Sequence, residues 1–166
     1  MQRIPRELAR KYAFDWRDDP LLRVKPNEVF ELETYDASTG YFKSEADKAI
    51  PGKRPGFDKV PPLANPIAGP IYVEGAERGD VLVVTLESIT VDSYSWIAIG
   101  PRRGPAGDST RWPELSGEYT TKIFQHTPGP SGTTRDGTLH FNSKISWPIT
   151  PFIGTIGVAP DREVTT

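Results

Sequence analysis

The sequence lacks cysteine altogether and has only two histidines among its 166 residues. Without cysteine there is no disulfide scaffold, no zinc finger, no iron–sulfur centre and no cysteine nucleophile. No apolar run approaches the roughly 18 residues that a membrane span needs. No apolar stretch of the signal-peptide type follows the basic start at residues 1–6. We therefore expect a cytoplasmic protein that makes no membrane contact.

An excess of charge is also missing, because 20 basic residues stand against 22 acidic ones and leave a net charge of −2. Domains that bind nucleic acid usually carry a basic surplus that neutralises phosphates. Nucleic acid is therefore not an expected partner. At 166 residues the chain has the length of one domain, residues 1–166, and its 36% hydrophobic content argues against disorder.

What the sequence has in excess is proline and glycine, since 17 prolines and 15 glycines make up about a fifth of the chain. Average proteins contain roughly 12% of the two together. Proline removes a backbone donor and clashes with the preceding helical turn, so long helices are not expected. Short strands with frequent turns fit better. The sequence therefore predicts an all-β sandwich or barrel of about seven to nine short strands with long loops.

Alternation of apolar and polar residues, or a short apolar run, marks the expected strands. They lie at residues 21–24, 29–34, 71–74, 81–89, 96–100, 119–125, 138–141 and 144–147. The strongest is 81–89, which is rich in β-branched residues and apolar on both faces, so it is expected to be central. Elsewhere, a helical turn is expected at 5–10, a short helix at 44–49 and long loops at 35–62 and 101–117.

Two carboxylates stand where strands are expected to end. Asp36 opens the first long loop, where a side chain could reach a pocket, and an Asx turn is the alternative. Glu74 ends an apolar strand and either caps the following turn or points into a site. His126 and His140 belong to no readable triad, and each is expected to be a surface or hydrogen-bonded histidine.

Four segments resemble the acetamidase/formamidase family, in the order in which the family carries them. Residues 65–84 resemble its Asn-Pro, Gly-Pro, Val-Glu-Gly-Ala and Gly-Asp-x-Leu pattern. Residues 33–38 resemble its Glu-Thr-x-Asp-Ala-Ser, and residues 96–101 its Trp-x-Ala-x-x-Pro. Residues 148–160 resemble its Pro-Phe-x-Gly-x-x-Gly-Val-Ala-Pro. Together the four segments extend over most of residues 20–160.

The resemblance implies a β-rich, homo-oligomeric amidase that hydrolyses a small linear amide to a carboxylate and ammonia. It also implies a divalent metal in some members, zinc or calcium, which could polarise the carbonyl and activate water. Motif membership and position at strand ends then suggest Asp36 and Glu74 as catalytic carboxylates, with Asp36 also a metal ligand. Asn65, the backbone near Gly69 and Trp96 are the expected substrate-binding groups, although Trp96 fits a core position equally well.

The departure from the family is in length, because its members are longer. Their second half carries Gly-Gly-Asn-x-Asp, Gly-Asp-x-His and Gly-Asp-Gly-Glu stretches that do not occur here. The chain thus resembles the N-terminal half of such an enzyme. It could be a short homologue that only binds, a subunit with a companion chain, or a precursor fragment. We favour cleavage of a precursor after Thr166, with a companion C-terminal chain as partner. The alternative is a catalytically silent all-β binding or assembly module.

Overall fold

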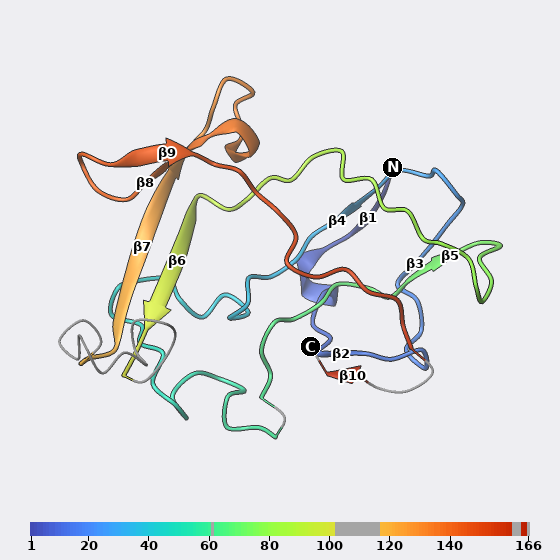
Figure 1. Cartoon of the computed structure of the whole chain (residues 1–166), viewed down its shortest axis with the longest axis horizontal. Helices are drawn as coiled ribbons and strands as arrows, with labels where there is room; N and C mark the ends of the chain where they lie inside the picture. Colours follow the sequence, from blue (N-terminus) through green and yellow to red (C-terminus); the bar gives the residue numbers. More distant parts are fainter. Residues whose placement is uncertain (61, 102–116, 161–163, 166) are drawn as a thin grey trace. The chain divides into compact units, whose positions relative to one another are not determined.

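The computed structural model describes residues 1–60, 62–101, 117–160 and 164–165, and in these residues the chain is all-β, as predicted (Figure 1). The chain falls into two compact units. The first comprises residues 1–41, 55–83 and 156–166, and the second comprises residues 42–54 and 84–155. No helix in the described ranges is long and apolar enough to cross a membrane.

The first unit contains three two-stranded pairings. Two are parallel and one is antiparallel: β1 (Gln2–Ile4) with β4 (Phe30–Leu32), β3 (Leu22–Val24) with β5 (Ile71–Val73), and β2 (Ala13–Phe14) with β10 (Val164–Thr165). A 3-10 turn, η1 (Arg6–Leu8), follows Pro5, whose fixed φ suits a helical start. This is the helical turn that the sequence predicted.

A carboxylate joins the segments that follow β1 and β4. Glu33 accepts the backbone N–H of Arg6 at 2.8 Å and forms an ion pair with Arg3. The Arg6 N–H, followed by the Arg3 guanidinium, lowers the pKa of Glu33 below its ordinary value. Ile4 and Val24 are buried in this unit and form part of its small apolar core.

The second unit is built on an antiparallel sheet with the order β6-β7-β8-β9. Its strands are β6 (Tyr94–Ile99), β7 (Thr120–Thr127), β8 (Thr138–His140) and β9 (Ser146–Pro148), with a 3-10 turn, η3 (Thr134–Asp136), before β8. The strand β7 is the longest arrow in Figure 1. Phe42, which is 1% exposed, packs on Trp96 of β6 with their ring centroids 4.2 Å apart.

Seven of the eight expected strands are present with shifted ends: they are β3, β4, β5, β6, β7, β8 and β9. The helix predicted at 44–49 is wrong, because the structure has only a turn there. The carboxylate of Asp47 accepts the backbone N–H groups of Lys43 and Ser44, at 2.9 and 2.8 Å, as at the start of a helix. The carbonyls of Glu45 and Asp47, however, accept the side chains of Lys48 and Thr121 rather than helical N–H groups. The loop predicted at 101–117 lies almost wholly outside the described residues.

The largest error concerns residues 81–89, which were expected to form a central strand and form none. Val81 is 87% exposed and Val83 is 81% exposed. No hydrogen bond within the described part of the chain involves residues 81–90. A strand is stabilised by a neighbouring strand and by packing across its faces, and β-propensity alone supplies neither. The described residues provide no neighbour for this segment.

The ion pair between Asp15 and Arg17 predicts how the stability of the fold changes with pH. The Arg17 side chain, and then its backbone N–H, lower the pKa of Asp15 from 3.8 to about 2. A lowered folded-state pKa stabilises the fold above pH 3.8, and this contribution disappears as the pH falls toward 2. NMR titration should therefore place the carboxyl midpoint near 2, and in Arg17→Gln it should return toward 3.8. A midpoint near 3.8 in both proteins would contradict the ion pair.

Candidate functional site

Asp36 follows β4 and opens a turn that its own side chain holds in place. Its Oδ1 accepts the backbone N–H groups of Ser38 and Gly40, the latter at 3.2 Å, and the hydroxyl of Ser38. This is the Asx turn that the sequence analysis gave as the alternative to a side chain reaching a pocket. Asp36 is exposed, and no hydrogen bond within the described residues reaches its Oδ2. The turn thus fixes the carboxylate while leaving one oxygen for other partners.

Asn65 lies beside this turn. Its backbone N–H donates to the carbonyl of Ala37 at 3.1 Å, and its φ of 52° is in the left-handed region that asparagine tolerates. On the same turn, Thr39 Oγ1 lies 3.0 Å from the hydroxyl of Tyr12. The structure therefore brings Asp36 and Asn65, two of the predicted site residues, to one place in the first unit.

Two arginine side chains contact the residue that precedes this turn. The guanidinium groups of Arg6 and Arg10 lie 5.6 and 5.0 Å from the ring centroid of Tyr35, the residue before Asp36. Arg10 also donates to the Tyr35 hydroxyl at 2.7 Å, and this contact raises the pKa of Arg10. The ring of Tyr35, directly before the turn, is therefore held between contacts with two cations.

Gly69 and Glu74 hold other positions in the first unit. Gly69 is buried with a φ of 122°, a conformation that favours glycine, and is joined to Pro70 by a cis peptide bond. Glu74 is exposed, and its backbone N–H extends the β3–β5 pairing by donating to Val24 at 2.8 Å. Within the described residues, no hydrogen bond or ion pair joins either residue to Asp36.

Trp96 belongs to the second unit, unlike the other four predicted residues. It is half-buried in β6, and its ring lies against Phe42 with an interplanar angle of 38°. That contact supports the core position, one of the two roles left open for this tryptophan.

The sequence did not reveal a serine–histidine pair on the sheet of the second unit. Ser95 Oγ lies 3.0 Å from Nε2 of His126, whose Nδ1 lies 2.7 Å from the carbonyl oxygen of Asp92. A carbonyl can only accept, so we assign the ring proton to Nδ1 and the Ser95 hydroxyl as donor to Nε2. His140 Nε2 lies 3.1 Å from Thr127 Oγ1. Both histidines are thus hydrogen-bonded, as predicted.

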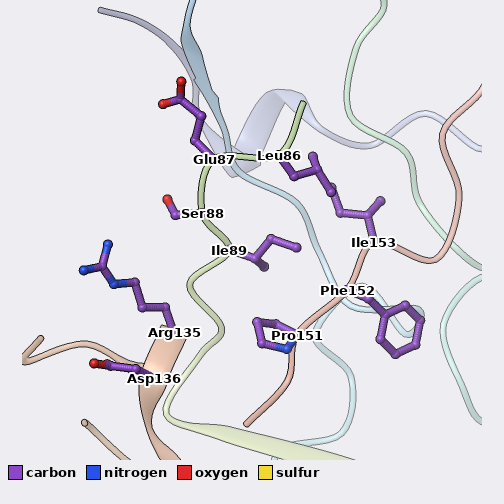
Figure 2. A pocket seen from close by; sticks show the side chains of 9 residues that line it. All are labelled: Leu86, Glu87, Ser88, Ile89, Arg135, Asp136, Pro151, Phe152 and Ile153. Atoms are coloured by element: carbon purple, nitrogen blue, oxygen red, sulfur yellow. The ribbon is translucent and has the colours of Figure 1, made fainter. Parts of the chain in front are cut away.

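A hollow of about 600 Å³ opens in the second unit (Figure 2). Its apolar lining comes from five side chains: Leu86, Ile89, Pro151, Phe152 and Ile153. Figure 2 shows Leu86 and Ile153 pointing toward one another, with Arg135 and Asp136 apart from them. None of the five predicted site residues lines this hollow.

The metal that the resemblance implies can be tested against the side chains. Among the described residues, no group of three or more histidine, aspartate or glutamate side chains is placed to hold a metal ion. Zinc usually takes four ligands, and calcium takes six to eight oxygens. Asp36 offers one donor, so the described residues do not by themselves fit either ion.

The comparison with known families agrees with the sequence motifs. Residues 7–166 match the model of the acetamidase/formamidase family. The chain belongs to this family. No curated protein matches it.

Solved structures of similar fold include acetamidases and a predicted acetamidase/formamidase. An acetamidase from Bacillus halodurans is 24% identical with a TM-score of 0.73, and covers 98% of this chain. A predicted acetamidase/formamidase from Thermoanaerobacter tengcongensis is 28% identical with a TM-score of 0.74, and covers 99%. An acetamidase from Yersinia enterocolitica is 22% identical with a TM-score of 0.70, and covers 99%. In each case the match takes 48% of the other chain, so this family member spans about half the length of these relatives.

Proposed function

We propose that this chain is the N-terminal part of an amidohydrolase that converts a small linear carboxamide and water into a carboxylate and ammonia. The observation that carries the proposal is the family match over residues 7–166. The likeness to the solved structures supports it, with TM-scores of 0.70 to 0.74.

Asp36 is the carboxylate that we propose for proton transfer. Its Oδ1 is occupied by the turn, so Oδ2 would accept a proton from the attacking water. The water oxygen then adds to the amide carbon, Asp36 returns the proton to the nitrogen, the C–N bond breaks, and the nitrogen leaves as ammonia. Glu74 is the second proposed carboxylate and would accept the proton of the carboxylic acid that forms, which leaves the carboxylate product. The side chain of Asn65 and the backbone near Gly69 would orient the amide.

The remainder of the site is proposed to come from a companion C-terminal chain. The length of the relatives supports this proposal, because the chain covers only 48% of each. We propose that a cytoplasmic precursor is cleaved after Thr166 and that the complete unit forms a homo-oligomer. A zinc or calcium ion would need donors from the companion in addition to Asp36, since the described residues supply no set of three.

Mass spectrometry and an ammonia assay together test these proposals. The protein from its natural source should give an 18.4 kDa chain together with a companion, and this complete form should release ammonia from formamide or acetamide. The 166-residue chain alone should release none. An active 18.4 kDa species without a partner would contradict the companion. A complete form that hydrolyses no amide would favour the silent binding module.

A further inference from the structure

The second unit leaves apolar side chains uncovered around the hollow. We call the five apolar residues that line it, Leu86, Ile89, Pro151, Phe152 and Ile153, the apolar hollow. Phe152 is 83% exposed, and Leu86 and Ile153 are each more than two-fifths exposed. Val84, beside the apolar hollow in sequence, is exposed to a similar degree. An apolar patch of this kind usually marks an interaction surface.

The backbone at the apolar hollow also lacks a partner among the described residues. Within the described part of the chain, no hydrogen bond involves residues 84–90 or residues 150–155. Residues 84–89 nevertheless have the β-prone composition of a strand. A β-prone segment without a neighbour has free N–H and C=O groups that can pair with a strand from another polypeptide.

The polar residues that line the hollow, Glu87, Ser88, Arg135 and Asp136, carry charges of both signs and so do not favour a ligand of one charge. Asp136 is engaged within its own turn, because it accepts the backbone N–H of Ser131 at 3.0 Å and the hydroxyl of the same residue. The hydrogen bond from the Ser131 hydroxyl lowers the pKa of this carboxyl. The hollow is open to solvent and has apolar side chains among polar ones, which suits the side chains of a polypeptide better than an enclosed small molecule.

The length of the relatives indicates what covers this surface. The chain matches 48% of each solved relative, so an equally long stretch of the family fold lies outside it. We propose that the apolar hollow, with residues 84–89 and 150–155, is the docking surface for the second half of the family fold. That half supplies a strand paired along residues 84–89 and apolar side chains that cover Phe152 and Ile153. The inference rests on the proposed function, because the occupant is its companion chain.

Hydrogen exchange can test the docking surface directly. The 166-residue chain is compared with the same chain bound to the polypeptide from its own organism that matches the uncovered half of the relatives. Amides of residues 84–89 should exchange rapidly in the chain alone and at least about tenfold more slowly in the complex. Unchanged exchange in these residues, or failure of the two polypeptides to bind, would overturn the proposal.

A pair of variants tests the apolar side chains. Phe152→Asp should weaken companion binding at least about 100-fold, because a charge would be buried without a partner. Val60→Asp, at a first-unit position that is 99% exposed, should change the affinity less than about threefold. Equal effects of the two variants would count against this surface.

Two further outcomes separate this proposal from its alternatives. If light scattering shows a particle of twice 18.4 kDa with residues 84–89 protected and no companion present, a second copy is the occupant and the proposal is wrong. If the companion docks as predicted but the complex releases no ammonia, the docking surface stands and the proposed amidase activity fails.

Discussion

Replacing Asp36 with asparagine in the complete enzyme should lower kcat/KM for amide hydrolysis by roughly 100-fold to 10,000-fold, the usual contribution of a general base. The fold should remain. An asparagine side-chain oxygen can accept the same N–H bonds from Ser38 and Gly40, so the turn is kept and only the charge is lost. The melting temperature should move by less than about 4 °C, which corresponds to roughly 1 kcal/mol in a chain of this size. Steady-state ammonia release and thermal unfolding measure the two effects separately.

Asp47 provides a matched control in the second unit. Its carboxylate also holds a turn, through the N–H groups of Lys43 and Ser44, and it has no place in the proposed site. Asp47→Asn makes the same chemical change in the same kind of local structure, so turnover should stay within about twofold of the wild type. If Asp36→Asn is as active as Asp47→Asn, Asp36 serves the turn alone and the proposed base is wrong.

The parts of the fold that the sequence predicted depend on local patterns. The strands at 29–34 and 119–125 were found because alternation records which side chains face a core. The strand expected at 81–89 has an even stronger pattern, but a strand also needs a neighbour, and that is a non-local requirement. The helix predicted at 44–49 also failed partly for a non-local reason, because the carbonyl of Asp47 accepts the hydroxyl of Thr121, 74 residues away.

In the candidate site, too, the local contacts could be predicted from the sequence and the long-range contacts could not. The Asx turn of Asp36 could be predicted because its partner lies two residues on. The bond from Asn65 to Ala37 joins distant parts of the chain, and the pair of Ser95 with His126 spans 31 positions. Finding the latter requires the register of β6 against β7, which neither composition nor periodicity supplies. Only long-range pairing could have identified these contacts.

The largest loss of stability is expected from Phe42→Ala. Phe42 is 1% exposed and is one of the two largest fully buried side chains in the described residues. It packs on Trp96 at 4.2 Å between ring centroids and lies 5.9 Å from the guanidinium of Arg54. Removing the ring leaves a cavity beneath β6, and such substitutions cost about 3–5 kcal/mol. Because typical domains are stable by only about 5–15 kcal/mol, the free energy of unfolding should fall by a large fraction.

Phe152→Ala is the matched control, since it deletes the same atoms in the same unit from a side chain that is 83% exposed. In the chain without its companion, this change should cost less than about 0.5 kcal/mol. Guanidinium unfolding followed by tryptophan fluorescence can compare the two, with Trp96 reporting on the contact that Phe42→Ala removes. Equal losses in the two variants would mean that Phe42 does not anchor this unit. With the companion present, Phe152→Ala should instead weaken binding, because its ring is then covered by the second chain.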